Sequence, residues 1–380
     1  MNSKKTIAAS VLGLVLLLAL GMMWQKRAGA RDAPLPSADL SRYASLHDSG
    51  GISTRQIADA AETLFDEDSA GTTQAFVLMR DGRILAERYG EDIDPETKLL
   101  SRSIGKTVTA TLIGLMVSDG RLALESPAPI PAWSQPGDPR GAITLRNLLQ
   151  MTSGLEHIED SEPLYTADSV RMLFTEGARD MATYAEAKPI AHPPGSHFTY
   201  STADTMILSD LMKRMLTNSD QPDRRRSAME EFIRGRLMTP AGLSSLTPEY
   251  DARGTMIGGA MMHMTARDYV RFGELLRNQG RVNGHQLLSA RWVAFMTTPS
   301  DRNPAYGGHL WLNREGGDGN PLFPGRGSRR IFAAIGHHGQ YLVVDPTRRL
   351  VILRMGLSTA EQYGAVRRGL LRLVELFPQG

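Results

Sequence analysis

The chain has 380 residues, 41% hydrophobic and 22% charged, a composition typical of a soluble globular protein rather than a disordered or fibrous one. The net charge is only +2, and the first 30 positions hold four of the 43 basic residues and none of the 41 acidic ones. The remainder is therefore nearly neutral, which argues against a nucleic-acid partner. Cysteine is absent, so disulfides, thiolate ligands and a cysteine nucleophile are excluded.

The amino terminus has the pattern of an export segment. Two lysines precede the uncharged residues 7–24, which as a helix would extend about 27 Å, close to the thickness of a bilayer core. Small residues at 28–30 offer a cleavage site, but two basic residues separate them from the apolar run and favour an uncleaved anchor. A buried helix of the fold is the remaining alternative. We expect residues 1–30 to be a signal peptide or membrane anchor and residues 31–55, rich in Ala, Pro and Ser, to be a linker.

The next segments predict a β-hairpin and then a helix. Residues 74–89 hold two short apolar runs on either side of the turn pair Asp81-Gly82. Residues 101–118 have apolar side chains at helical spacing, and Gly120 is a natural stop. The middle of the chain reads as helices joined by Pro- and Gly-containing loops, at 145–151, 204–216 and 266–279.

The carboxyl-terminal part returns to strands and ends with an amphipathic helix. The strands are expected at 331–335, 340–344 and 350–355, and the helix at 360–377. Because strands occur near both termini, the simplest packing is one antiparallel sheet built from both ends and flanked by helices. We therefore expect an α/β (α+β) fold with a mostly helical insert at about 120–300.

A Ser-x-x-Lys pattern marks the start of the 101–118 helix. Ser103 and Lys106 are three residues apart and share one helix face, so the amine can reach the hydroxyl, which needs a base to become a good nucleophile. The alternative is a capping serine and a solvated lysine. A phosphate-binding loop is disfavoured because position 100 is Leu100 instead of glycine, and the chain holds no Gly-x-Ser-x-Gly elbow.

Two further stretches carry candidate polar groups. Tyr200 lies in a stiff loop just before a helical pattern, where it can face a cleft or simply pack at the helix start. His337 and His338 lie at the entrance to a strand within Gly-His-His-Gly-Gln. Neighbouring residues of a strand face opposite ways, so a metal site is disfavoured and one histidine lining a cleft is favoured.

Together these features resemble the superfamily of class C β-lactamases, penicillin-binding proteins and related esterases, in which Ser-x-x-Lys, Tyr-x-Asn and Lys-Thr-Gly follow one another. The resemblance covers about residues 70–375 and implies a β-lactamase/transpeptidase-like fold over 56–380. The nearest subgroup is the 6-aminohexanoate-dimer (nylon-oligomer) hydrolases. Further similar stretches lie at 145–155, 265–273, 338–340, 344–346, Tyr306-Gly307 and Trp311-Leu312-Asn313.

The resemblance implies a role for each residue. Ser103 attacks an acyl carbon, and Lys106 bonds to Ser103 and keeps its proton mobile. Tyr200 is a general acid or base whose phenolate Lys106 would favour. The backbone N–H groups of Ser103 and Gln340 would hold the oxyanion. No metal or organic cofactor is implied.

Two departures bear on the substrate. Thr202 stands in place of the Asn of Tyr-x-Asn and His337 in place of the Lys of Lys-Thr-Gly, so we expect weak or absent β-lactam turnover. Substrate contacts are expected from Thr202, His337, His338 and Gly339. We expect an enzyme of the cell envelope, periplasmic or extracytoplasmic, that cleaves small linear amides or esters. The alternatives are a β-lactamase or D-alanyl peptidase, and a non-catalytic envelope binding protein of the same fold.

Overall fold

The computed structural model describes residues 37–316 and 321–379, and residues 39–380 form one compact unit. The expected export segment, residues 1–30, lies outside the described residues. Within the described ranges, no helix has the length and apolar character needed to cross a membrane.

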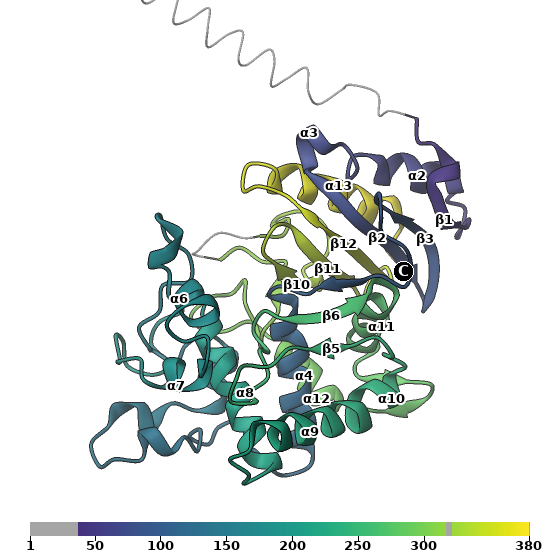
Figure 1. Ribbon diagram of the computed structural model, residues 1–380. Coiled ribbons are helices and arrows are strands. Elements are labelled where there is room, and N and C mark those ends of the chain that lie inside the picture. Colours follow the sequence, from purple (N-terminus) through teal and green to yellow (C-terminus); the bar gives the residue numbers. More distant parts are fainter. Residues whose placement is uncertain (1–36, 317–320, 380) are drawn as a thin grey trace, which may run out of the picture. The chain divides into compact units, whose positions relative to one another are not determined.

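A seven-stranded antiparallel sheet forms the centre of this unit (Figure 1), in the order β1-β3-β2-β12-β11-β10-β9. The two ends of the chain meet in the middle of the sheet, where β2 pairs with β12 along its whole length. The strands are β1 (Tyr43–Leu46), β2 (Thr72–Arg80), β3 (Arg83–Tyr89), β9 (Trp311–Leu312), β10 (Phe332–Gly336), β11 (Gln340–Asp345) and β12 (Leu350–Leu357).

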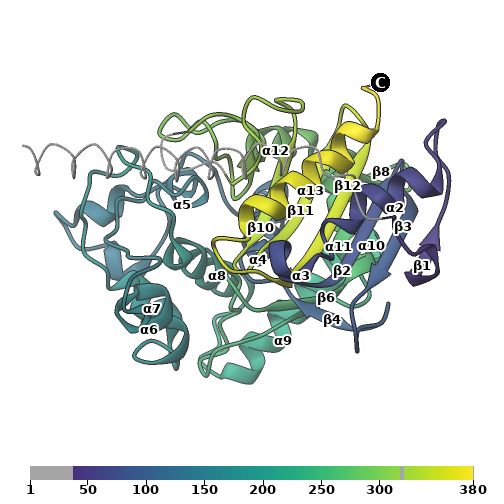
Figure 2. The same ribbon diagram turned by 90° about the horizontal axis from the view of Figure 1, so that it is seen from above.

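The alternation of side chains along β2 divides the core into two layers. Phe76 and Leu78 pack with helices α2 and α13 on one face, whereas Ala75 and Val77 pack with α4 and α11 on the other. Figure 2 shows α13 and α2 side by side over the first face. These helices are α2 (Thr54–Glu62), α3 (Glu67–Ala70), α4 (Ile104–Ser118), α11 (Ala266–Arg277) and α13 (Tyr363–Leu376).

The insert between α4 and β9 is mostly helical and forms one side of the unit (Figure 1). Its helices are α5 (Leu145–Leu149), α6 (Asp168–Phe174), α7 (Met181–Glu186), α8 (Thr202–Leu216), α9 (Pro222–Ile233), α10 (Thr239–Ala241) and α12 (Ala290–Met296). Two small sheets are built from β4 (Lys98–Leu100), β6 (Met262–Thr265) and β5 (Thr247–Pro248), and from β7 (Arg281–Val282) and β8 (His285–Gln286). Single turns of 3-10 helix lie at Leu40–Arg42, Pro131–Trp133, Pro139–Ala142 and Leu164–Thr166, and a π-helical turn lies at Arg234–Met238.

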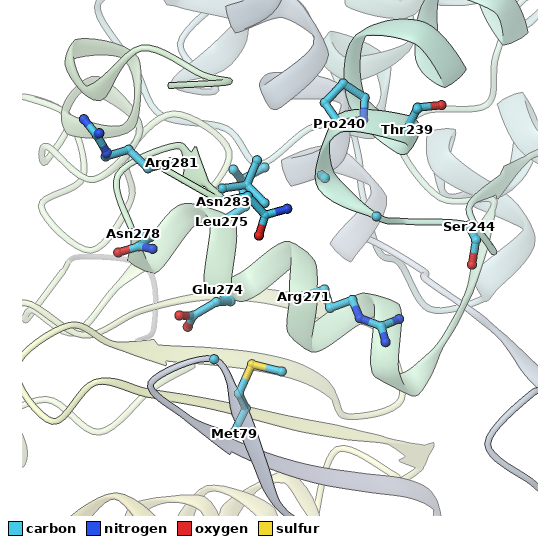
Figure 3. Close-up of a pocket in the computed structure, with 14 residues that line it drawn as sticks. Met79, Thr239, Pro240, Ser244, Arg271, Glu274, Leu275, Asn278, Arg281 and Asn283 are labelled. Atoms are coloured by element: carbon cyan, nitrogen blue, oxygen red, sulfur yellow. The ribbon is translucent and has the colours of Figure 1, made fainter. Parts of the chain in front are cut away.

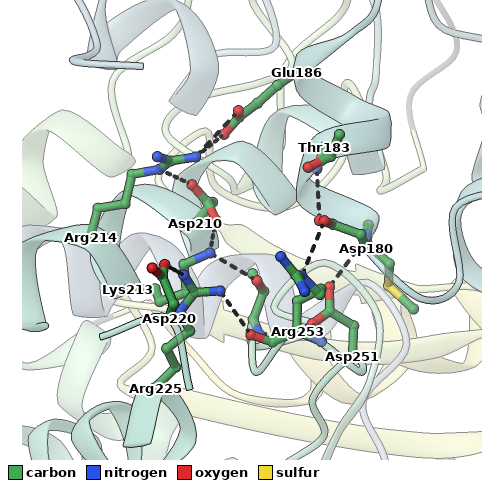
Figure 4. A network of polar contacts seen from close by, with 12 residues as sticks. Asp180, Thr183, Glu186, Asp210, Lys213, Arg214, Asp220, Arg225, Asp251 and Arg253 are labelled. Atoms are coloured by element: carbon green, nitrogen blue, oxygen red, sulfur yellow. Dashed lines mark hydrogen bonds and ion pairs between the residues drawn. The ribbon is translucent and has the colours of Figure 1, made fainter. Parts of the chain in front are cut away.

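A buried ionic network joins α7 to α8 (Figure 4). The carboxylate of Asp210, 1% exposed, is bonded by both Lys213 and Arg214, and Arg214 also lies 3.5 Å from Glu186. Burial and the charge of Asp210 raise the pKa of Glu186 to about 8, so Glu186 is largely protonated at neutral pH. The ion pairs of Asp210 with Lys213 and Arg214 therefore lie within α8, and α7 joins them through the protonated Glu186.

The expected hairpin, carboxyl-terminal strands and principal helices are confirmed, with ends that differ by a few residues. The segment expected to be a linker contributes structure instead: residues 43–46 form β1, which pairs with β3 at the sheet edge, and α2 begins at Thr54. A four-residue edge strand without a clear apolar alternation gives no signal in composition.

Candidate active site

Ser103 is the residue immediately before α4, on the face of the sheet that α4 and α11 cover. The preceding Arg102 has a φ of 48°, a left-handed conformation that turns the chain sharply into the helix. Strand β10 comes close to this turn because Gly336 has no side chain; a Cβ there would lie 2.8 Å from the carbonyl oxygen of Ser101. The nucleophile candidate therefore sits between a helix N-terminus and the end of a strand.

Lys106 lies one turn further along α4 and is only 1% exposed. Its Nζ lies 3.0 Å from the Oγ of Ser103, 2.8 Å from the Oγ1 of Thr202 and 3.0 Å from the carbonyl oxygen of Gly259. Burial lowers the pKa of Lys106, and the nearby carboxylate of Glu159 opposes that shift. The structure thus brings Ser103 and Lys106 together as the Ser-x-x-Lys spacing predicts.

Tyr200 lies beside this pair: its ring centroid is 5.0 Å from Nζ of Lys106, and its hydroxyl interacts with the Ser103 side chain. The resemblance implies a phenolate at Tyr200, but the surroundings of its hydroxyl favour the neutral phenol. Burial, reinforced by the carboxylate of Glu159, raises the pKa of Tyr200 far above its usual value. The phenol therefore stays protonated and is a proton donor rather than a standing base.

Aromatic neighbours hold the Tyr200 ring. The indole of Trp311, on β9, stacks on it with centroids 5.6 Å apart, and Tyr306 meets both rings edge-on. Both residues belong to the stretch that resembles the nylon-oligomer hydrolases. Their packing fixes the direction of the phenol without any bond to its oxygen.

Glu159 is a member of the site that the sequence did not reveal. One carboxylate oxygen accepts a 2.5 Å bond from the hydroxyl of Thr202, and the other accepts from the backbone N–H of Thr202 and the ring of His157, both at 2.7 Å. Lys106 and these donors outweigh burial and hold the pKa of Glu159 at about 2. Thr202, expected as a substrate contact, is itself 2% exposed and lies between Lys106 and Glu159.

The Gly-His-His-Gly-Gln stretch forms the turn between β10 and β11. His337 is exposed and His338 partly buried, with ring centroids 4.2 Å apart, and burial together with the charges of His337 and Arg102 lowers the pKa of His338. Gly339 is buried with a φ of 79°, a left-handed turn position. Only His337 and His338 of this turn therefore present side chains at the surface.

The resemblance implies that the backbone N–H of Gln340 is an oxyanion donor, and this role stays a prediction. Gln340 lies on β11, an interior strand paired with β10 on one side and β12 on the other, and it is 3% exposed. Its side chain bonds back to the carbonyl oxygens of Gly356 and His337. The strand that contacts the Ser103 turn is β10, whose end beyond Ala333 is not covered by β9.

A cavity of about 660 Å³ lies elsewhere, between the β2–β3 turn, α10, α11 and the β7–β8 hairpin (Figure 3). Its polar lining includes Arg271, Glu274 and Arg281. Arg271 bonds to Asp268 and Glu274 to Arg277, so these charges are already paired. None of the candidate catalytic residues lines this cavity.

The sheet, the helical insert and the Ser-Lys-Tyr group define the class of protein. The family model described as beta-lactamase matches residues 59–375, and the chain belongs to this family. It is a serine hydrolase of the β-lactamase-related kind, with the β-lactamase/transpeptidase-like fold.

Among characterised relatives, the 6-aminohexanoate-dimer hydrolase of Paenarthrobacter ureafaciens is 23% identical over 345 residues, 86% of each chain. A Bacillus anthracis structure provisionally described as a 6-aminohexanoate-dimer hydrolase aligns with a TM-score of 0.67 at 19% identity, over 90% of this chain and 91% of that one. A family VIII carboxylesterase aligns with a TM-score of 0.59 at 17% identity, over 85% and 96% of the two chains. The resemblance to the family and to its nylon-oligomer hydrolase-like members is confirmed.

Proposed function

We propose that this hydrolase cleaves small linear amides or esters through an acyl-enzyme formed on Ser103. The observation that carries the proposal is the 3.0 Å contact of the Ser103 hydroxyl with Lys106 at the N-terminus of a buried helix, with Tyr200 beside both. A base and a protonated phenol on one serine hydroxyl supply the proton acceptor and the proton donor that acyl transfer needs.

The reaction proceeds in two halves. The Ser103 oxygen bonds to the acyl carbon as its proton leaves, and the carbonyl electron pair moves onto the oxygen, stabilised by backbone N–H groups at the helix start. Collapse of this intermediate breaks the bond to the amine or alcohol, which takes a proton from Tyr200, and the proton that left Ser103 restores the phenol. Water then attacks the acyl group and gives up a proton to the base. That proton returns to the Ser103 oxygen as its bond to the acyl carbon breaks and the acid leaves.

The substrate class follows from the two departures from the family pattern. The hydroxyl of Thr202 is engaged by Glu159 and Lys106, so no side-chain amide is presented where the family has Asn. An exposed histidine, His337, replaces the lysine that holds a substrate carboxylate. Both features support a small linear amide or ester over a β-lactam, in agreement with what the named relatives are described as hydrolysing.

We also propose that the enzyme works outside the cytoplasm, held or led there by residues 1–30. Support comes from the two lysines ahead of an uncharged run of membrane length. In cells that express the full chain, protease added to spheroplasts should degrade the hydrolase and spare a cytoplasmic marker. Survival of both proteins until the cells are lysed would contradict export.

The catalytic assignment is tested with the full-length chain on a p-nitrophenyl ester and on a linear amide. Ser103→Ala should lose activity entirely, whereas Ser118→Ala, at the far end of the same helix, should keep it. Equal hydrolysis by wild type and Ser103→Ala would refute the nucleophile. Hydrolysis of nitrocefin as fast as the best ester would refute the substrate class in favour of a β-lactamase, and inactivity with every substrate would favour a binding protein.

A further inference from the structure

A continuous chain of hydrogen bonds runs from His157 through Glu159 and Thr202 to Lys106 and ends at Ser103. Thr202 is the link: its Oγ1 lies 2.5 Å from Glu159 and 2.8 Å from Nζ of Lys106. Thr202 and Lys106 are 2% and 1% exposed, so water does not compete for these bonds. Tertiary folding alone brings these residues together, since Glu159 and Thr202 lie 53 and 96 positions beyond Lys106 in the chain.

The direction of each bond in this chain is fixed by chemistry. Glu159 is ionised and can only accept, so the hydroxyl hydrogen of Thr202 points at Glu159. The oxygen of Thr202 is then left to accept from Lys106. The carbonyl of Gly259, 3.0 Å from Lys106, can also only accept. Two of the three neighbours of the lysine amine therefore each demand one N–H.

These demands orient the amine. A neutral lysine has two N–H bonds and one free electron pair, and Thr202 and Gly259 use both N–H bonds. In the protonated lysine the third N–H donates to the hydroxyl of Ser103, 3.0 Å away, and loss of that proton leaves the free pair directed at the same oxygen. Rotation about the last side-chain bond would break one of the two fixed hydrogen bonds inside a buried site, where an unmade bond is expensive.

We propose that Thr202 and Glu159 are positioning residues that aim the free electron pair of Lys106 at Ser103, so that Lys106 takes the proton of the nucleophile. This inference rests on the proposed acyl-enzyme reaction and names its base. As the bond from the Ser103 oxygen to the acyl carbon forms, its O–H bond breaks and the proton passes to Nζ. Tyr200, kept protonated beside Glu159, gives its proton to the leaving amine or alcohol and regains a proton from Lys106.

Close packing supports this role for Thr202. A Cβ on Gly259 would lie 2.9 Å from the Cγ2 of Thr202, so the glycine lets its carbonyl come close to the lysine while the methyl group of Thr202 fills the space beside it. A threonine thus has both the oxygen for Lys106 and the methyl for this contact. Serine keeps only the oxygen, and valine keeps only the methyl.

The test compares Thr202→Val, Thr202→Ser and Thr109→Val in the full-length chain. Thr109 is a matched control. It lies on α4, the helix that carries Lys106, and its buried hydroxyl bonds to the carbonyl of Gly258 and not to Lys106. The readouts are the labelling rate of Ser103 by a fluorophosphonate and kcat/KM for the ester. Since general-base catalysis contributes about 10²–10⁴-fold, Thr202→Val should lower both rates by about 100-fold, Thr202→Ser by under about fivefold and Thr109→Val by under about threefold.

Glu159→Gln gives an independent readout through the pH profile. The titratable groups facing Lys106 are Glu159, Asp160, Tyr200 and His309. Lys106 acts when deprotonated, so activity rises with pH through its pKa. Removing the carboxylate removes the interaction that raises that pKa, and the acid limb of kcat/KM should move down by about one pH unit.

Two outcomes overturn the inference while sparing the proposed function. The first is a rate of Ser103 labelling in Thr202→Val that stays within about threefold of the wild-type rate. The second is an acid limb of the kcat/KM profile that stays in place or moves to higher pH in Glu159→Gln. A wild-type enzyme that neither hydrolyses esters nor is labelled at Ser103 would overturn both this inference and the proposed function. Circular dichroism and melting of each variant separate a lost fold from a misdirected lysine.

Discussion

Asp204 lies on α8 close to the catalytic group, and its burial favours the protonated acid over the carboxylate. It is fully buried, with one oxygen accepting from Ser153 and the other unpartnered. Burial raises its pKa to about 8, and the nearby Ser153 and Ser201 side chains only partly oppose this shift. Because this folded-state pKa lies above the unfolded value, its contribution to stability is present below about pH 4 and is lost as pH rises through 8.

Asp204→Asn should therefore stabilise the folded chain at alkaline pH. The amide resembles the protonated acid and keeps an acceptor for Ser153. At pH 9 the free energy of unfolding should rise by about 1–3 kcal/mol, the cost of a buried unsatisfied polar group, and the gain should shrink towards pH 5. Thermal melting of both proteins at the two pH values measures this, and a gain of the same size at both would contradict the titration.

At the same scale, the sequence predicted the members of the site that lie close in the chain. Ser103 and Lys106 share a helical turn, so their contact needs only local geometry. Glu159 lies in a segment without regular secondary structure, and only tertiary folding brings it to Thr202. Nothing in its neighbours marks it as buried.

At the scale of the elements, the strength of the local pattern decided what could be predicted. The β2–β3 hairpin, α8 and α11 have long apolar patterns and clear turn or cap residues, and all were expected. The three-stranded β4-β6-β5 sheet was not, because its strands have two to four residues each. This sheet nevertheless matters for the site. Strand β4 ends just before Ser103 and pairs with β6. The loop before β6 carries Gly259, whose carbonyl oxygen accepts a hydrogen bond from Lys106.

Across the whole molecule, one buried side chain ties the two ends of the chain to the turn beside the site. Arg354, on the central strand β12, is fully buried, and burial lowers its pKa to about 10. Within the described part of the chain its acceptors are one hydroxyl and four carbonyl oxygens, those of Thr73, Ala70, Thr72, His338 and Gly339. The amino-terminal segment before β2 is therefore linked to the β10–β11 turn through a single guanidinium.

Replacing Arg354 by Met should destabilise the whole unit, because carbonyl groups from segments on both sides of β12 would lose a charged donor in the dry core. We expect a loss on the order of 3–5 kcal/mol in the free energy of unfolding, as for other broken buried polar networks. Arg326→Met is the matched control: its ion pair with Glu375 is largely exposed, and its loss should change stability by about 0.5 kcal/mol or less. Chemical denaturation of the full-length variants, followed by tryptophan fluorescence, gives both values. Equal midpoints for the two variants would mean that the ends of the chain are held by strand pairing alone and that the buried guanidinium is dispensable.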